Sequence, residues 1–268
     1  MGWYPGLPPV IHTDAMSNET VVVVQALAMM LLPLAAVGAY RRASGAQFSV
    51  AKAGAGAFTD SFYMGLRFVL AMLVDRVDPL WLKVILLGLL AGVCEEGARY
   101  MVMRRMKDTR GEDPFRAAVM FGLGHGGMES ALLGLSLLMS VVGAVSGLGF
   151  VTIAAGNTVL WLRALAVAER AMAMVLHVGC SLLVMRAART GDGRYGLAAV
   201  ALHASVNAGV LWVLLHRGPF KAEAAMAVMT VGVIGLIAWM RGRMGEALPD
   251  PDAAEKADED GAEGEGAS

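Results

Sequence analysis

Long apolar runs constrain the fold of this chain more than any other feature. They lie at about 20–39, 47–74, 80–104, 114–142, 163–187, 195–215 and 223–241. A helix of about 20 residues is long enough to cross the hydrocarbon core of a bilayer. Apolar residues make up 57% of the 268 residues, whereas soluble domains average about 45–50%. The sequence therefore predicts an all-α fold, a polytopic bundle of about seven transmembrane helices.

Lysine and arginine residues concentrate after every second run. These connections carry, in order, Arg41 and Arg42; Arg104, Arg105, Lys107 and Arg110; Arg186, Arg189 and Arg194; and Arg241 and Arg243. Loops rich in basic residues stay preferentially on the cytoplasmic side. We therefore expect the N-terminus outside and the C-terminus inside, in a multi-pass protein of the bacterial inner membrane.

The two ends of the chain differ in character from the central part, which predicts three regions. Residues 1–19 form an N-terminal extension, and translation could begin at Met16. Residues 20–245 form the transmembrane domain. Residues 246–268 contain nine acidic residues and one lysine, so this tail carries −8 and the rest of the chain +7, because the total is −1. A tail of this composition is expected to be disordered.

A few polar residues interrupt the apolar runs, and they lie at one depth. The third run contains Glu95, Glu96 and Arg99; the fourth His125 and Glu129; the fifth Arg170, His177 and Ser181; and the sixth His203 and Asn207. Counted from the nearest predicted cytoplasmic end, Glu96, His125, His177 and His203 are eight to eleven residues deep. At about 1.5 Å per residue, this is about 12–17 Å. Four helices thus place an acid or an imidazole in one layer.

Helical spacing predicts that these residues also share faces. His125 and Glu129 are four residues apart, and so are His203 and Asn207, which places each pair on one side of its helix. Polar groups that face a bundle interior can pair with one another, hold water or bind a metal. Simpler interpretations are that a single histidine only makes a helix contact, and that Glu129 only forms an ion pair with Arg99 or Arg170.

Imidazoles and carboxylates are ligands that Zn²⁺ prefers, and a catalytic zinc site keeps one position for water. Without a metal, a glutamate held by histidine and arginine could activate water as a general base, and Asn207 could donate to the developing oxyanion. Both routes would hydrolyse a peptide bond within the membrane. A proton-coupled transporter could use the same residue types, so the spacing alone does not decide the class.

The order of these motifs resembles that of a known family. The chain carries E-E-x-x-R at Glu95, Glu96 and Arg99, then H-G-G-x-E-S from His125, then H-x-x-x-S from His177 and H-x-x-x-N from His203. This pattern, over about residues 20–241, resembles the YhfC family of intramembrane metalloproteases. That family is grouped with the PrsW proteases and the CPBP group, which includes the type II CAAX prenyl endopeptidases. The E-E-x-x-R spacing is one residue shorter than in the CAAX-type enzymes, and Asn207 stands where relatives have an aspartate.

The resemblance implies a function and a set of site residues. Catalytic roles fall to Glu95 or Glu96 as the activator of water, together with Arg99, Glu129 and Asn207. Metal ligation, with Zn²⁺ as the expected ion, falls to His125, His177 and His203. For some relatives, however, a glutamate mechanism without metal is favoured. The expected partners are the lipid bilayer and a membrane-bound peptide or protein substrate, with no nucleic acid. The alternatives are a non-catalytic scaffold or immunity protein of the same fold, and a proton-coupled transporter.

Overall fold

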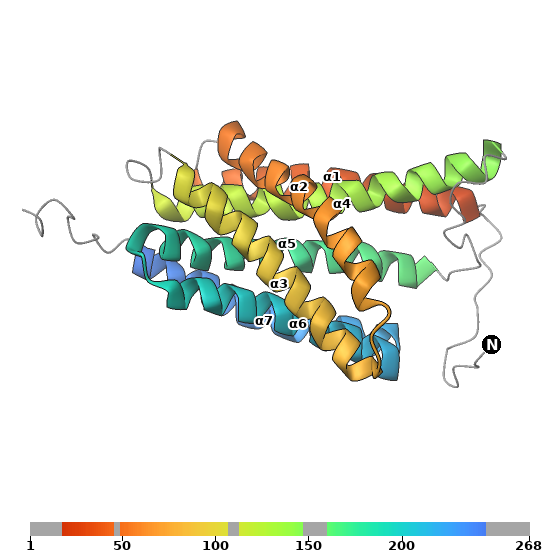
Figure 1. The fold of residues 1–268 in the computed structure, drawn as a ribbon. Coiled ribbons are helices and arrows are strands. Elements are labelled where there is room, and N and C mark those ends of the chain that lie inside the picture. The colour runs from red at the N-terminus through yellow and green to blue at the C-terminus, as the bar shows by residue number, and fades with distance from the viewer. Residues whose placement is uncertain (1–17, 46–48, 107–112, 147–159, 245–268) are drawn as a thin grey trace, which may run out of the picture.

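The computed structural model describes residues 18–45, 49–106, 113–146 and 160–244, which contain seven α-helices and no strand. The helices are α1 (Asn18–Ser44), α2 (Val50–Val74), α3 (Leu80–Arg105), α4 (Pro114–Ser146), α5 (Leu160–Thr190), α6 (Gly193–Arg217) and α7 (Pro219–Met244) (Figure 1). The all-α prediction is confirmed, and each helix begins and ends within five residues of its predicted bounds. Of the predicted N-terminal extension only residues 18 and 19 are described, and the acidic tail lies outside the described residues.

Local sequence explains where several helices begin. The side-chain oxygens of Ser49, Asp113 and Asp192 accept hydrogen bonds from backbone N–H groups two or three residues later, at 3.4, 3.0 and 3.0 Å. Such caps satisfy N–H groups that have no partner inside the first turn. Between α6 and α7, Gly218 has a φ of 82°, a left-handed conformation that glycine adopts without steric cost. Asp192 and Gly218 thus lie in the short connections between α5 and α6 and between α6 and α7, and the helices of each pair pack side by side.

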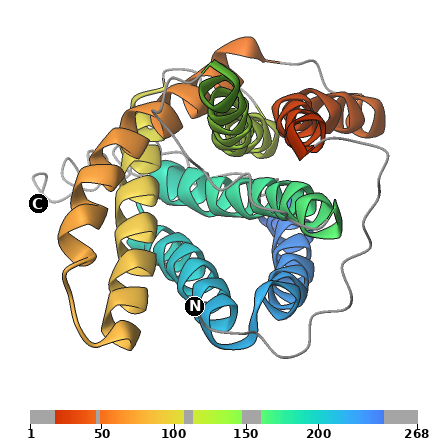
Figure 2. The same cartoon turned by 90° about the vertical axis from the view of Figure 1, so that its right-hand side faces the viewer.

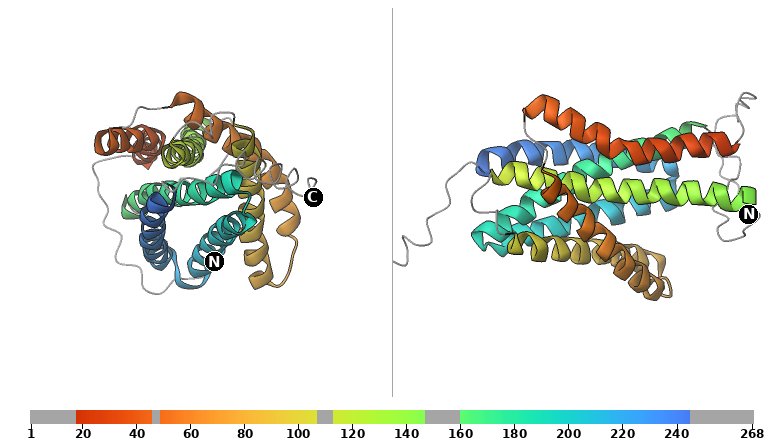
Figure 3. Two further views of the ribbon diagram at one scale, coloured as in Figure 1. Left: turned by 90° about the vertical axis from the view of Figure 1, so that its left-hand side faces the viewer. Right: turned by 90° about the horizontal axis from the view of Figure 1, so that it is seen from above.

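Helix α5 lies at the centre of the bundle. It packs against α1, α3, α4, α6 and α7, and 72% of its apolar window is buried, compared with 17–28% for the other candidate spans. Figure 2 shows α5 between the α1/α4 pair and the α6/α7 pair, with α2 and α3 along one side. The two further views in Figure 3 show the same arrangement. A residue on α5 can therefore contact side chains from most of the other helices.

Among the seven helices of the described residues, six are long and apolar enough to cross a membrane, and these are α1, α2, α4, α5, α6 and α7. The third predicted span, α3, is not among them. Its 26 residues include six charged ones, namely Lys83, Glu95, Glu96, Arg99, Arg104 and Arg105. At about 1.5 Å per residue α3 is still about 39 Å long. Three of its charged residues, Glu95, Glu96 and Arg99, face the interior of the bundle and are buried. Of the seven predicted spans, six are therefore apolar enough to cross a bilayer, and the seventh, α3, is long enough but carries more charge.

The exposed surface and the ends of the helices also fit a bilayer protein. Large apolar side chains such as Leu34, Phe62 and Val231 are 68–71% exposed, and a soluble monomer rarely exposes wide apolar areas. Arginines occupy the last turns of α1, α3, α5 and α7, which gather at one end because consecutive helices run in opposite directions. The side of the membrane that this end faces stays a prediction.

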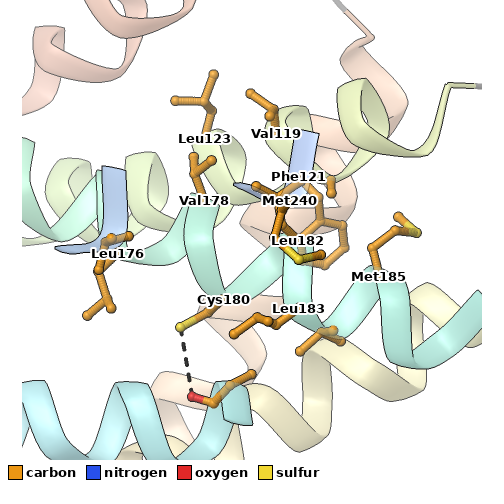
Figure 4. Packing of buried hydrophobic residues seen from close by; sticks show 14 of the residues in the cluster. Val119, Phe121, Leu123, Leu176, Val178, Cys180, Leu182, Leu183, Met185 and Met240 are labelled. Atoms are coloured by element: carbon orange, nitrogen blue, oxygen red, sulfur yellow. Dashed lines mark hydrogen bonds between the residues drawn. The ribbon is translucent and has the colours of Figure 1, made fainter. Parts of the chain in front are cut away.

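The apolar core lies where α4, α5 and α7 meet. Figure 4 shows Val119 and Phe121 of α4 beside Leu182 of α5 and Met240 of α7, all nearly or fully buried. The thiol of Cys180 points toward α6 and donates to the backbone oxygen of Ala199 at 3.9 Å (Figure 4). This packing fixes the rotation of α5 about its axis, and so fixes the direction in which its polar residues point.

Candidate active site

One polar side chain from each of four helices meets inside the bundle. Glu95 lies on α3, His125 on α4, His177 on α5 and His203 on α6. Glu95 Oε2 lies 3.2 Å from His125 Nε2, 3.6 Å from His203 Nε2 and 4.0 Å from His177 Nδ1. All four residues are buried, with at most 3% of their surface exposed. We refer to these four residues as the His/Glu cluster.

Two further carboxylates hold the outer nitrogens of two of these rings. Glu96 Oε1 lies 2.7 Å from His203 Nδ1, and Glu129 Oε2 lies 2.8 Å from His177 Nε2. In each case the ring nitrogen not bound to this carboxylate faces Glu95. A carboxylate behind an imidazole fixes the tautomer and the orientation of the ring, an arrangement common behind metal-ligating histidines.

Arg99 joins two parts of the site. Its Nη1 donates to both oxygens of Glu96, at 2.7 and 2.6 Å, and its Nη2 lies 3.2 Å from His177 Nδ1. Since a guanidinium can only donate, His177 Nδ1 accepts this hydrogen bond, and His177 Nε2–H donates to Glu129. Arg99 is completely buried, so it orients Glu96 and His177 together.

The close approach of α4 and α5 depends on a glycine beside the histidines. A Cβ at Gly126 would lie 2.8 Å from His177 Cδ2 and 3.0 Å from Met174 Cα. A methyl group at that position would push α5 away from α4. The small residue one position after His125 therefore allows the His125 and His177 rings to come within 4.8 Å of each other, measured between centroids.

Helix α2 contributes two residues that the sequence analysis did not assign to the site. Asp60 Oδ1 lies 3.6 Å from His125 Nε2, and Arg67 Nη1 lies 3.1 Å from Glu95 Oε1. Asp60 is buried, whereas 39% of the Arg67 side chain is exposed. The signal in the sequence was an acid and an arginine seven residues apart in an apolar helix, which places both on one face.

The remaining predicted residues lie at different distances from the cluster. Glu129 pairs with Arg170, whose Nη1 lies 3.3 Å from Glu129 Oε1, and not with Arg99. Ser181 is buried, and its hydroxyl has no partner in the described part of the chain. Asn207 lies one turn beyond His203 and is half-buried, and no hydrogen bond or ion pair joins it to the cluster among the described residues. Its role stays a prediction.

The donor set fits a divalent metal ion. Glu95, His177 and His203 each offer one ligand atom, and these atoms lie within 4.8 Å of one another; a second such group contains Glu96, Cys180 and His203. If His203 Nδ1–H donates to Glu96, His203 Nε2 presents a lone pair toward Glu95 Oε2, which is also an acceptor. Two acceptors that face each other without a donor between them suit a cation. Arg99 would compete with the ion for the His177 Nδ1 lone pair.

Comparisons with known proteins identify the family of the chain. Residues 28–230 match a family model described as YhfC intramembrane metalloprotease. The chain is 30% identical over 177 residues to "Uncharacterized membrane protein YhfC" of Bacillus subtilis (strain 168), an alignment that covers 59% of this chain and 66% of the relative. The chain thus spans slightly less than two thirds of that relative's length. No solved structure matches.

Proposed function

Because this chain belongs to the YhfC intramembrane metalloprotease family, we propose that it is an endopeptidase that hydrolyses a peptide bond of a membrane-associated substrate. It is a multi-pass integral membrane protein, with six helices apolar enough to span a bilayer. The family description supports a membrane protease in general terms. The identity of the groups that act on water and substrate is our own assignment.

The observation that carries this proposal is the convergence of three imidazoles on one carboxylate oxygen. Nitrogens of His125, His177 and His203 lie 3.2–4.0 Å from Glu95 Oε2. A scaffold protein has no need of such a group, since buried charged residues in a membrane protein are costly to maintain. Hydrolysis needs it, because water must be bound, deprotonated and directed at a carbonyl carbon.

We assign the protein's own groups as follows. Glu95 Oε2 accepts the proton of the attacking water, because this oxygen faces the imidazoles while Glu95 Oε1 pairs with Arg67. Glu96 is a positioning residue, since its oxygens already accept from Arg99 and His203. Glu129 orients His177 in the same way. Asn207 would donate to the developing oxyanion.

The residues that would hold a divalent ion are His125, His177 and His203, with Glu95 beside them, and Zn²⁺ suits such nitrogen and oxygen donors. A bound ion of this kind would polarise the substrate carbonyl and make water more acidic. Glu96 would keep His203 in the orientation that presents a free Nε2 lone pair. Glu129 would orient His177, whose Nδ1 lone pair Arg99 would have to release to the ion. Arg99 would hold Glu96 in place during the reaction.

The proposal is tested by comparing membrane proteins from cells that express the wild type or Glu95→Gln. Mass spectrometry of protein N-termini identifies peptides whose new N-termini depend on the wild-type chain. We expect new termini in or near membrane-spanning segments of other proteins, and their loss in Glu95→Gln. Removing a general base typically lowers the rate by about 10²–10⁴-fold, which is enough to abolish the signal.

The matched control is Asp75→Asn, which removes a carboxylate whose side chain is 81% exposed and lies in the connection between α2 and α3. This variant should retain every new terminus. If Glu95→Gln, folded and present at wild-type level, yields the same new termini as the wild type, the proposed hydrolysis is wrong. A wild type that produces no new termini would instead favour the non-catalytic scaffold.

A further inference from the structure

A chain of polar contacts leads from the His/Glu cluster toward the end of the bundle where α5 begins. Glu129 accepts from His177 at 2.8 Å through Oε2 and pairs with Arg170 through Oε1 at 3.3 Å. Arg170 Nη2 in turn donates to Glu169 Oε1. These contacts connect α4 and α5 over two helical turns. Neither Arg170 nor Glu169 is needed by the hydrolytic mechanism described above.

The side chains that follow His177 along the chain of contacts are all more exposed than His177 itself, and Glu169 at the far end is the most exposed. From the cluster outward, the exposed fraction of the side chain is 3% for His177, 19% for Glu129, 13% for Arg170 and 32% for Glu169. The cluster itself is closed, with His125 and Arg99 completely buried. The polar contacts therefore connect a closed interior to a partly open surface.

The open end of this chain of contacts lies at a depth where lipid would otherwise be expected. Glu129 is next to Ser130, the middle residue of α4, and Glu169 is six residues before Val175, the middle residue of α5. At about 1.5 Å per residue, Glu169 is only about 9 Å from the middle of its helix. A carboxylate in hydrocarbon costs at least about 2.5–3.5 kcal/mol. The exposed parts of Glu129 and Glu169 therefore face water.

The partly exposed arginine on the other side of the site differs in this respect. Arg67 is 39% exposed, and a long side chain of this kind can lie with its aliphatic part along apolar surface while its Nη1 donates to Glu95 Oε1 at 3.1 Å. A glutamate side chain is too short to do so from the middle of a helix. The partial exposure of Glu129 and Glu169, on the side of α4 and α5, thus requires water inside the depth of the membrane.

A third carboxylate, on α7, points to water at the same place. Glu223 is close enough to Glu169 and Arg170 to interact with both electrostatically. Its Oε2 is buried and accepts no hydrogen bond from the residues that the structure describes. A buried carboxylate oxygen without a donor is costly, and an ordered water would supply the donor. Helices α5 and α7 pack together, so this water would lie between them.

We propose that water enters the bundle between α4, α5 and α7, from the end where α5 begins, along Glu169, Arg170 and Glu129 to His177. The inference deepens the proposed hydrolytic function, because every turnover consumes one water in a site that is otherwise closed. In the predicted orientation the entrance opens on the non-cytoplasmic side. Arg170 holds Glu129 toward the passage, so that the carboxylate borders both water and His177.

Cysteine accessibility tests the route without a cleavage assay. Glu169→Cys and Glu223→Cys are made in a Cys94→Ala/Cys180→Ala background, reconstituted in liposomes and treated with a charged, membrane-impermeant methanethiosulfonate reagent. The matched control is Ala168→Cys, one residue before Glu169 on another face of α5 and exposed in the absence of lipid. Arg217→Cys marks the end of the bundle where α5 begins, and Arg194→Cys marks the opposite end.

We expect Glu169→Cys and Glu223→Cys to react at least about tenfold faster than Ala168→Cys, because lipid excludes the charged reagent from the control position. They should react from the same side as Arg217→Cys. The proposal is overturned if neither variant reacts faster than Ala168→Cys, or if both react only from the side of Arg194→Cys. These outcomes do not depend on proteolysis, so a failure of the proposed hydrolysis would leave the accessibility result intact.

Discussion

Arg99 and Glu96 form a fully buried ion pair, in which one guanidinium nitrogen donates to both carboxylate oxygens at 2.6 and 2.7 Å. The side-chain exposure is 0% for Arg99 and 1% for Glu96. Removing one partner of such a pair leaves a buried charge without compensation. Glu95, the neighbouring carboxylate, instead pairs with Arg67, which is 39% exposed. The two adjacent glutamates should therefore respond differently to substitution.

We predict that Glu96→Gln lowers the stability of the folded protein by about 3–5 kcal/mol, the range for breaking a buried pair. Glu95→Gln should cost much less, because water can reach Arg67. Thermal unfolding of the two variants in the same detergent measures this difference. An equal loss of stability in both variants would contradict the prediction, because it would show that Arg99 depends on Glu96 no more than Arg67 depends on Glu95.

Metal binding should depend on the three histidines of the His/Glu cluster and not on histidines elsewhere in the chain. We predict that purified wild-type protein, equilibrated with Zn²⁺ and then freed of unbound ion, retains about one zinc per chain, as expected of a single catalytic site. His203→Ala should weaken binding by more than about tenfold, since even residues behind the ligands contribute about 10–100-fold. Elemental mass spectrometry gives the metal content.

His216→Ala is the matched control for this measurement. His216 lies on the same helix as His203 but is exposed and stacks on Trp212, with 3.8 Å between the ring centroids. Its removal should leave zinc binding unchanged. Equal metal content in His203→Ala and His216→Ala would remove the metal from the mechanism and leave Glu95 as a metal-free general base.

Much of the fold could be predicted because the bilayer sets the helix length. Pro114 begins α4 at the predicted position, and Pro219 begins α7 four residues before its predicted start. Depth was also predictable, since a rise of about 1.5 Å per residue converts sequence position into height along a helix. His125, His177 and His203 were thus expected in one layer, and the structure brings them together around Glu95.

The contribution of α2 could not be predicted, because the neighbour of a helix in a bundle is decided by packing and not by its own sequence. Asp60 and Arg67 share a face, but nothing in the apolar pattern shows that this face turns toward His125 and Glu95. The partner of Glu129 was open for the same reason. The sequence allowed Glu129 to pair with either Arg99 or Arg170, and the rotation of α5 about its axis places Arg170 beside Glu129.

The contact between α2 and α4 makes a further prediction about stability. A Cβ added at Gly56 would collide with the backbone oxygen of Phe121 and lie 2.9 Å from His125 N, whereas a Cβ added at Gly54 meets nothing within 4 Å. We predict that Gly56→Ala destabilises the protein by about 1–3 kcal/mol, the usual cost of overpacking. Because α2 carries Asp60 and Arg67, the same change should also displace these residues from the cluster.

Gly54→Ala is the control for this prediction, since it makes the same substitution two residues away on the same helix. Alanine favours a helix over glycine by about 0.8–1 kcal/mol, so this variant should be neutral or slightly more stable. Denaturation midpoints of the two variants test the prediction. A Gly56→Ala protein as stable as Gly54→Ala would mean that α2 and α4 are not packed as closely as the structure shows.

Arg163, near the start of α5, should be dispensable for stability although it is buried. It is 8% exposed, and its Nη1 donates to Gln25 Oε1 at 3.1 Å. Its Nε and Nη2 have no partner among the residues that the structure describes. Replacing incompletely paired buried charge with an apolar side chain of similar volume is often neutral or stabilising by about 1–4 kcal/mol. We therefore predict that Arg163→Met, combined with Gln25→Leu, keeps or raises the unfolding temperature.

Arg170→Met provides the contrast, because Arg170 lies seven residues later on the same face of α5 and is paired with Glu129 and Glu169. Its loss leaves two carboxylates without their cation, so this variant should unfold at a clearly lower temperature than the wild type. Thermal unfolding of both variants in one detergent separates the cases. If the Arg163→Met/Gln25→Leu protein is destabilised as much as Arg170→Met, the two free nitrogens of Arg163 have acceptors that stabilise the fold, and an anion or ordered water at that position becomes the next group to identify.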